Sequence, residues 1–291
     1  MMRSLLFVPG DSEKKLAKAL DLGADGVVLD LEDSVVAQRK DLARNMTRDF
    51  LMDRSKRSTQ LWVRINPLDS GDVLHDLAAI VPTAPDGIML PKAESPLDVE
   101  KVSNFIDVLE VEHGLEIGSV GIIPVATETP TAVFNIGDYQ FGSPRIRALT
   151  WGAEDLSAAI GASENVDEIG SWLPPHQVTR ALCLFAAYAG GVQAMDTVMA
   201  DFRNEDGLKR VCNEARRDGF TGKIAIHPAQ VPVINEAFSP STEELAHARA
   251  VIDAFAATPD AGTLSLDGKM IDRPHLKQAE RIVALAEMLD R

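Results

Sequence analysis

The stretch "VGIIPVATETPTAV", residues 120–133, decides the fold class because it joins an apolar run to a polar end. The run is continuously apolar and does not alternate, which is typical of a strand covered on both faces, as in a parallel sheet. It ends at Ala126, and Glu128 stands two residues further on, shortly before Pro130. Because burying an unpaired carboxylate is costly, a strand that ends in Glu128 predicts a functional site at its carboxyl end.

Similar apolar or β-rich runs recur along the chain, and segments of helical composition separate them. Eight strand–helix repeats predict an α/β fold, a (β/α)8 TIM barrel, with a doubly wound open sheet as the alternative. The segment "VPGDSEKK" lacks the glycine spacings of phosphate-binding loops. The eight expected strands are "SLLFVP" (4–9), "GVVLDLE" (26–32), "LWVRINP" (61–67), "GIMLPK" (87–92), "GIIPVAT" (121–127), "IRALTWG" (146–152), "GVQAMDT" (191–197) and "KIAIHP" (223–228).

Helix boundaries and the end of the chain define two regions. The segment 11–24 predicts a helix that begins at an Asp-Ser cap. Two further predicted helices end in glycine, and they begin with Ser-Pro in the segment 95–114 and with proline in the segment 174–191. We expect residues 1–235 to form the catalytic barrel and residues 236–291 to form a C-terminal helical extension. In that extension two helices, "SPSTEELAHARAVIDAFAAT" and "HLKQAERIVALAEMLD", flank "PDAGTLSLDGKMIDRP", which has the composition of a loop.

Composition excludes several classes of partner. The formal net charge of −15 argues against a nucleic-acid partner. The first residues, "MMRSLLFVPGD", contain an apolar run too short for a signal peptide or a membrane span, so we expect a cytoplasmic protein without a membrane partner. The two cysteines, Cys183 and Cys212, lack metal-ligand spacing and are expected to be free buried thiols.

Charged or polar residues end the predicted strands, and in a (β/α)8 barrel these ends carry the active site. Glu128 and Asp155, from successive strands, offer oxygen ligands of the kind that Mg²⁺ takes. No cysteine and only one histidine, His227, stand at the predicted strand ends, which argues against zinc. Arg64 offers a planar fork suited to a carboxylate or an enolate. The residues at the strand ends are Asp30, Glu32, Arg64, Asn66, Lys92, Glu128, Glu154, Asp155, Asp196 and His227.

A structural role is the alternative for several of these residues. Asp155 precedes "LSAAIG" and stands where it would cap a helix. The acidic residues within 30–33 either form a solvated turn or pair with a cation from another strand end. Asp196 and His227 are expected to be structural, whereas Glu128 is the hardest to explain by structure alone.

Several short motifs together resemble the HpcH/HpaI aldolase and citrate lyase β-subunit (CitE-like) family. The segments "AFSP" and "GKMIDRP" resemble its longer members, which are malyl-CoA lyases, citramalyl-CoA lyases and malyl-CoA thioesterases. The resemblance spans nearly the whole chain, and it is the order of many weak motifs that makes it specific. The other motifs are "RSLLFVPG", "GVVLDLEDSV", "VRIN", "LPK", "ATET", "WGAEDLSAAIG" and "IHPAQV".

The resemblance implies a Mg²⁺-dependent barrel, with Mn²⁺ as an alternative metal, that makes or breaks a C–C bond next to a carbonyl. Glu128 and Asp155 match the metal ligands of the family. Arg64 matches the arginine that contacts the metal-bound substrate oxygens. Asp272, in "MID", matches an acid/base residue that is presented to the site of a neighbouring subunit.

The resemblance also implies the partners. Lys14 and Lys15 lie where the family has basic residues near the phosphates of CoA, and either lysine fits that contact. The backbone N–H groups of Ala153, Glu154 and Asp155, where a helix begins, are suited to the carboxylate of a 2-keto acid. Family members are trimers or hexamers, so a homo-oligomer is expected.

The expected function is cleavage or formation of a β-hydroxyacyl-CoA such as malyl-CoA, methylmalyl-CoA or citramalyl-CoA, giving an acyl-CoA and a 2-keto acid. The alternatives are a malyl-CoA-type thioesterase, a citrate lyase β subunit acting on a citryl thioester, and an aldolase acting on free 2-keto-3-hydroxy acids. A non-catalytic interaction subunit is disfavoured because the four residues that match the catalytic and metal-binding positions are all kept. Thr129-Pro130 after Glu128 departs from typical citrate lyase β subunits, and so does the complete "MID" segment, which favours a stand-alone CoA enzyme over a citrate lyase complex.

Overall fold

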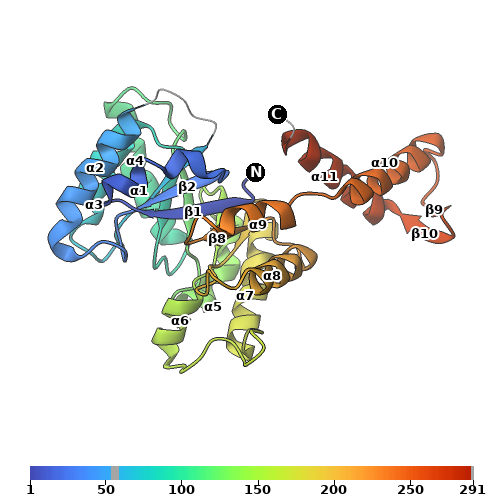
Figure 1. Cartoon of the computed structure of the whole chain (residues 1–291). Coiled ribbons are helices and arrows are strands. Elements are labelled where there is room, and N and C mark those ends of the chain that lie inside the picture. The colour runs from blue at the N-terminus through green and yellow to red at the C-terminus, as the bar shows by residue number, and fades with distance from the viewer. Residues whose placement is uncertain (54–58, 290–291) are drawn as a thin grey trace. The chain divides into compact units, whose positions relative to one another are not determined.

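The computed structural model describes residues 1–53 and 59–289. The chain divides into two compact units, one comprising Met2–Asn235 and the other Glu236–Arg291 together with Met1 (Figure 1). The larger unit contains eight parallel strands, and the smaller contains two long helices and a hairpin.

The larger unit is a parallel sheet in which helices follow the strands, and the (β/α)8 prediction is confirmed. The strand order is β5-β4-β3-β2-β1-β8-β7-β6, so β1 lies between β2 and β8. All eight expected strands are present. Their bounds are β1 Ser4–Pro9, β2 Gly26–Asp30, β3 Gln60–Arg64, β4 Gly87–Leu90, β5 Gly121–Pro124, β6 Ala148–Thr150, β7 Gln193–Asp196 and β8 Gly222–Ala225.

Backbone hydrogen bonds between β5 and β6 close the sheet into a barrel. The N–H of Ile122 donates to the carbonyl of Arg145 at 2.8 Å, and the N–H of Arg147 donates to the carbonyl of Ile122 at 3.0 Å. Nearer the carboxyl ends, the N–H of Ala126 donates to the carbonyl of Thr150 at 2.8 Å. The two strands at the ends of the sheet order are therefore joined, which rules out the open doubly wound sheet.

Apolar side chains fill the barrel interior and define which strand positions point inward. Val28 and Trp62 belong to this buried cluster. Because side chains on a strand alternate between its faces, Asp30 and Arg64, two residues further along, also face inward, at the carboxyl ends. Gly87 leaves room for the Trp62 indole, since a Cβ there would lie 2.2 Å from its Cζ3.

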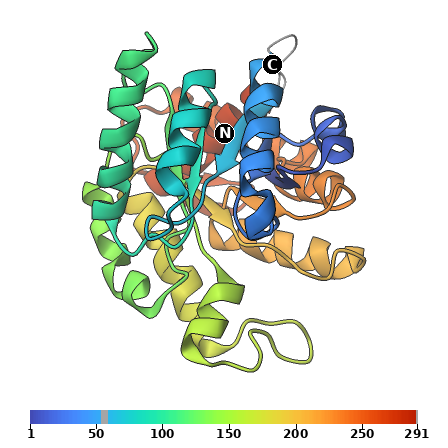
Figure 2. The ribbon, with the colours of Figure 1, turned by 90° about the vertical axis from the view of Figure 1, so that its left-hand side faces the viewer.

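Helices cover the outside of the barrel, and Figure 2 shows α2, α3 and α4 side by side. None of the helices in the described residues is long and apolar enough to cross a membrane. Cys183 and Cys212, on α7 and α8, are free and buried, as expected. The helices of this part of the chain are α1 Glu13–Leu16, α2 Lys40–Met52, α3 Val73–Ile80, α4 Pro96–Glu112, α5 Pro130–Asn135, α6 Ala153–Ile160, α7 Pro174–Ala189, α8 Glu205–Asp218 and α9 Gln230–Ala237.

The segment 11–24 differs from its prediction. In place of one helix it forms two short turns, α1 and a 3₁₀ turn over Ala19–Leu22. Each turn buries a single residue, Leu16 in the first and Ala19 in the second, so neither has the apolar face that supports a longer helix.

The smaller unit contains a hairpin where the sequence predicted a loop. The strands β9 (Thr263–Leu266) and β10 (Lys269–Asp272) pair antiparallel between α10 (Thr242–Ala257) and α11 (Arg273–Leu289). Asp267 and Gly268 connect the strands with φ values of 50° and 75°. Asp-Gly with both residues left-handed is the preferred two-residue hairpin turn, so the prediction of a loop was wrong.

Candidate active site

Ion pairs and one backbone hydrogen bond connect the polar residues at the carboxyl ends of the barrel strands. Arg64 pairs with Glu32, Glu32 pairs with Lys92, and Lys92 reaches both Asp155 and Glu128. The structure thus brings Arg64, Glu128 and Asp155, three of the predicted site residues, into one continuous network. We call these five residues the mouth network.

Arg64 is held in a fixed orientation on the inward face of β3. Its Nε and Nη2 donate to the two carboxylate oxygens of Asp30 at 2.7 and 2.8 Å. The guanidinium lies 4.6 Å from the centre of the Phe7 ring, and its Nη1 lies 2.9 Å from Glu32. Although burial alone would raise the pKa of Asp30, the guanidinium lowers it. Asp30 therefore serves as an ionised anchor for Nε and Nη2, while Nη1 of Arg64 pairs with Glu32 and, at 3.5 Å, with Asp33.

Glu32 and Lys92 form the centre of the network. The ammonium of Lys92 donates to Glu32 Oε1 and lies 3.7 Å from Oδ1 of both Asp33 and Asp155. Burial raises the pKa of Glu32 despite the opposing effects of Arg64 and Lys92. The acidic residues at 30–33 are therefore paired with cations and do not form a solvated turn.

Glu128 is buried at the mouth, with 3% of its surface exposed. Its carboxylate accepts a short hydrogen bond from the backbone N–H of Lys92. Burial, followed by the charges of Asp155 and Glu32, raises the pKa of Glu128 to about 8. Gly152 provides the space for this side chain, because a Cβ at Gly152 would lie 2.5 Å from Cγ of Glu128.

Asp155 lies in the first turn of α6, and its side chain is 36% exposed. The residue at the cap position of this helix is Gly152, so the predicted alternative of capping by Asp155 is wrong. Ala153 and Glu154 precede Asp155 in the same turn, and the Glu154 carboxylate accepts a hydrogen bond from Asn165 at 2.9 Å. The first N–H groups of a helix have no acceptor within the helix, so this turn can receive an anion.

Glu128 and Asp155 fit a hard divalent cation. Glu128 is a buried carboxylate near other acidic groups, and Asp155 adds a second oxygen donor near it. Among the described residues, no group of three or more His, Cys, Asp or Glu side chains forms a complete metal cage. Two carboxylates with remaining positions for water and substrate oxygens are the usual donor set of Mg²⁺.

Two of the other predicted site residues lie on α1. Lys14 and Lys15 are exposed on this helix, which follows β1 and therefore starts at the carboxyl end of a strand.

His227 and Asp196, the two residues that were expected to be structural, have partners consistent with that role. The ring of His227 stacks on Phe202 at 4.3 Å, and Asp196 accepts hydrogen bonds from buried Lys223 and from Trp151, both at 2.9 Å.

Asp272 belongs to the smaller unit. It ends β10 and does not lie in a loop between helices, which corrects the prediction. Its Oδ1 pairs with Nδ1 of His275, and this hydrogen bond lowers the pKa of Asp272. His275 was not identified from the sequence; its position three residues after Asp272, at the start of α11, was the available signal.

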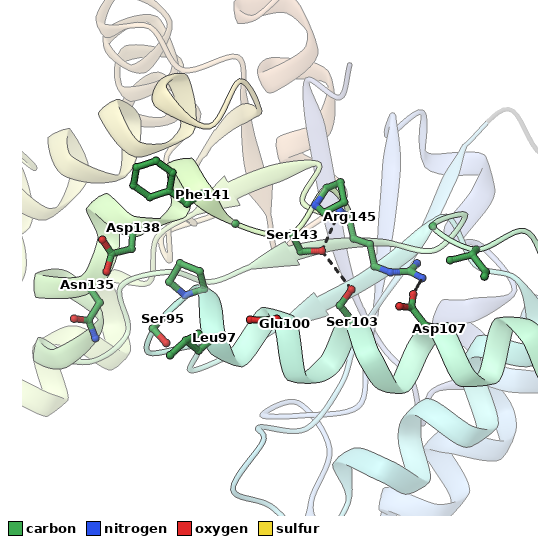
Figure 3. A pocket seen from close by; sticks show the side chains of 15 residues that line it. Ser95, Leu97, Glu100, Ser103, Asp107, Asn135, Asp138, Phe141, Ser143 and Arg145 are labelled. Carbon is green, nitrogen blue, oxygen red and sulfur yellow. Dashed lines mark hydrogen bonds and ion pairs between the residues drawn. The ribbon is translucent and has the colours of Figure 1, made fainter.

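A separate open groove of about 850 Å³ lies on the outside of the barrel between α4 and the 3₁₀ segment Ile136–Phe141 (Figure 3). Arg145 lies in this groove, but it is buried and paired with Glu110 and Asp107. The groove is lined by helix and loop residues and does not include any of the mouth network.

A closed barrel whose mouth joins adjacent carboxylates to an anchored arginine defines a class of enzyme that stabilises oxyanion charge with a hard cation. A family model described as HpcH/HpaI aldolase/citrate lyase matches residues 3–228. The chain belongs to the HpcH/HpaI aldolase/citrate lyase family, and the expected class, a CitE-like Mg²⁺-dependent lyase, is confirmed.

Relatives with several activities cover nearly the whole chain. Citrate lyase subunit beta of Escherichia coli (strain K12) is 34% identical, covering 98% of the chain and 93% of the relative. The mitochondrial citramalyl-CoA lyase of Rattus norvegicus is 36% identical, covering 98% and 86%. The (3S)-malyl-CoA thioesterase of Cereibacter sphaeroides is 32% identical, covering 99% and 95%.

A solved structure shares the fold. Protein CitE from Mycobacterium tuberculosis, crystallised in complex with magnesium, acetoacetate and coenzyme A, is 33% identical to the chain. The similarity covers 98% of each chain with a TM-score of 0.82.

Proposed function

We propose that the chain is a Mg²⁺-dependent lyase that cleaves a β-hydroxyacyl-CoA, or forms it in the reverse direction. Malyl-CoA, methylmalyl-CoA and citramalyl-CoA are the proposed substrates, and an acyl-CoA and a 2-keto acid are the products. The observation that carries the proposal is the joining of Arg64 to the carboxylates of Glu128 and Asp155 in one network. This set combines cation ligands with a donor for substrate oxygens.

Cleavage requires the substrate hydroxyl to release its proton to solvent water while the C–C bond breaks and its electrons pass to the thioester as an enolate. Mg²⁺ bound by Glu128 and Asp155, or Mn²⁺ in its place, supplies Lewis-acid stabilisation of the hydroxyl and carboxylate oxygens. Asp30 fixes the orientation of Arg64 through Nε and Nη2, and the guanidinium exchanges its Nη1 contact with Glu32 for negative charge on the substrate.

Other residues bind the ends of the substrate. The N–H groups of Ala153, Glu154 and Asp155 receive the carboxylate of the keto acid, since the start of a helix favours anions. Lys14 or Lys15, both exposed on α1, contacts the phosphates of CoA. With these assignments, the substrate carbon whose C–C bond breaks lies between the first turn of α6 and Arg64 of the mouth network.

Asp272 completes the chemistry in this proposal. It protonates the enolate carbon during cleavage, and it removes a proton from the acyl-CoA during condensation. The residue reaches the barrel of a neighbouring subunit, so the active form is a homotrimer or a hexamer, acting in the cytoplasm.

A thioesterase is the second candidate, because the relative from Cereibacter sphaeroides is a (3S)-malyl-CoA thioesterase at similar identity. In that reaction water attacks the thioester carbonyl, the C–S bond breaks, and CoA leaves after protonation of its sulfur. The same cation site and Arg64 serve both reactions, so the products distinguish the two.

A panel of CoA thioesters tests the proposal. The protein is incubated with malyl-CoA, methylmalyl-CoA and citramalyl-CoA in the presence of Mg²⁺, and the products are resolved by chromatography. We expect a keto acid and an acyl-CoA; free acid and free CoA would instead show a thioesterase. Glu128→Ala and Asp155→Ala should each abolish turnover while circular dichroism shows an intact fold. Full turnover by EDTA-treated wild type would contradict the proposal.

A further inference from the structure

Lys92 contacts both proposed metal ligands, one through its backbone and the other through its side chain. We propose that Lys92 is a positioning residue for the cation site, whose N–H holds Glu128 and whose ammonium acts as the counter-ion of the carboxylates when no metal is bound. The inference rests on the proposed Mg²⁺ site and assigns a role to a residue that is not itself a ligand. Two independent features of Lys92 support it.

The first feature is the backbone of Lys92, which has a φ of 51°. This left-handed conformation is uncommon for a residue other than glycine and is strained. The conformation directs the backbone N–H at the carboxylate of Glu128, to which it donates a short hydrogen bond. Because such strain persists only where the surroundings impose it, the position of Glu128 and the turn at Lys92 depend on each other.

The second feature is the placement of the ammonium. It bonds to Glu32 and lies 3.7 Å from carboxylate oxygens of Asp33 and Asp155, with the side chain 34% exposed. Acidic groups outnumber basic groups in and around the mouth network. The carboxyl groups are those of Asp30, Glu32, Asp33, Glu128 and Asp155, and the cations are those of Arg64 and Lys92.

A divalent cation bound by Glu128 and Asp155 would compete with the ammonium for the same negative charge. Removing the charge of Lys92 should therefore have two opposite effects. The metal-free protein loses a counter-ion and becomes less stable, while the carboxylates attract Mg²⁺ more strongly. A lysine that merely held the loop in place would produce the first effect without the second.

The test measures Mg²⁺ binding to EDTA-treated and dialysed protein by isothermal titration calorimetry. Thermal unfolding with and without Mg²⁺ gives a second readout that needs no substrate. The main variant is Lys92→Met, which keeps a long side chain, and Lys92→Arg retains the charge. Lys101→Met is the matched control, because Lys101 is exposed and pairs with Asp98 outside the network.

For Lys92→Met we expect Mg²⁺ affinity to rise, on the order of tenfold, because a positive charge near the cation has been removed. The metal-free melting temperature should fall, and the increase caused by Mg²⁺ should be larger than in wild type. Lys92→Arg should bind Mg²⁺ within about twofold of wild type, because it retains the positive charge. Lys101→Met should do the same, because the charge that it removes is exposed and distant from the site.

Unchanged or weaker Mg²⁺ binding by Lys92→Met overturns the inference while leaving the proposed metal site intact, provided that wild type binds the ion. If wild type does not bind Mg²⁺, both the inference and the proposed function fail. Lys92→Gly covers the case in which the methionine variant does not fold, because glycine adopts positive φ without strain and keeps the N–H. Its Mg²⁺ affinity must also exceed that of wild type, or the inference is wrong.

Discussion

The proposed role of Arg64 depends on the planar shape of its guanidinium as much as on its charge. Its Nε and Nη2 bind both oxygens of Asp30, and its Nη1 faces Glu32. We expect Arg64→Lys to lower kcat/KM on the order of 10²-fold, because an ammonium cannot keep both contacts and misplaces the charge. Steady-state kinetics measure this effect. Arg147→Lys, at an exposed arginine, is the control, and a lysine variant with wild-type kcat/KM would show that the assigned role is wrong.

Gly152 controls the position of Glu128, because a Cβ at Gly152 would meet the Glu128 side chain at 2.5 Å. Gly152→Ala should displace the carboxylate and weaken Mg²⁺ binding by roughly 10–100-fold, the usual effect of disturbing the surroundings of a metal ligand. Calorimetry of the metal-free protein measures the change. Gly137→Ala should bind Mg²⁺ like wild type, since a Cβ there meets no atom within 4 Å. Equal affinities for the two variants would contradict this account.

The residues of the mouth could be predicted only in part. Arg64, Glu128 and Asp155 come at or just after the ends of apolar strands, and a barrel brings such residues together at one end, so the sequence was enough to predict that they lie close together. The roles of Lys92 and Gly152 could not be predicted, because they depend on a left-handed backbone and on a close approach between segments distant in sequence.

At the scale of elements, the strands were more predictable than the short connections. Continuous apolar runs bounded by glycine or proline define parallel strands well, and all eight were confirmed. The segment 11–24 forms two turns, each of which buries only one residue, Leu16 or Ala19. The hairpin of β9 and β10 was missed although Asp267-Gly268 is a strong turn signal, because its strands are short and largely exposed.

The helix α4 is tied to the barrel by Glu110, which is fully buried. Its carboxylate accepts hydrogen bonds from the N–H groups of Gly118 and Val120, both at 2.8 Å, and from Arg145 at 2.9 Å. Although burial alone would raise the pKa of Glu110, these bonds lower it from 4.5 to about 2. The carboxylate therefore stabilises the fold fully above pH 4.5, and this contribution is lost as the pH falls towards 2.

Glu110→Gln should lower the free energy of unfolding at pH 7 by about 1.5–3 kcal/mol, the contribution of hydrogen bonds to a charged group. Urea unfolding of both proteins at several pH values measures this difference. It should shrink as the pH falls from 4.5 towards 2, because the wild-type carboxylate becomes protonated in that range. Glu112→Gln, at an exposed position of the same helix, is the control. A difference that does not depend on pH would mean that Glu110 acts only through packing.

At the scale of the whole molecule, the proposed chemistry divides between the two units. The larger unit supplies Arg64 and the proposed metal ligands, and the smaller unit supplies Asp272, whose carboxylate pairs with His275. If Asp272 acts on a neighbouring barrel, one chain alone lacks an acid/base group, and assembly becomes a condition for activity. This dependence makes the proposal testable by mixing subunits.

Asp272→Asn should bind Mg²⁺ as wild type does, because Asp272 is not one of the proposed ligands. Its turnover should fall about 10²–10⁴-fold, the usual contribution of a general acid or base. Kinetics and calorimetry on the same preparation measure the two effects. Asp253→Asn, at an exposed position of α10, is the control and should keep wild-type turnover.

Mixing Asp272→Asn with Glu128→Ala tests whether the residue acts across subunits. Each variant lacks a different part of the site, so an oligomer that contains both chains should hold some complete sites, formed by Glu128 of one subunit and Asp272 of another. We expect part of the wild-type activity to return after subunit exchange, while each variant exchanged with itself stays inactive. Native mass spectrometry verifies that mixed oligomers have formed. Mixed oligomers without any regained activity would show that Asp272 serves its own barrel or takes no part in the reaction.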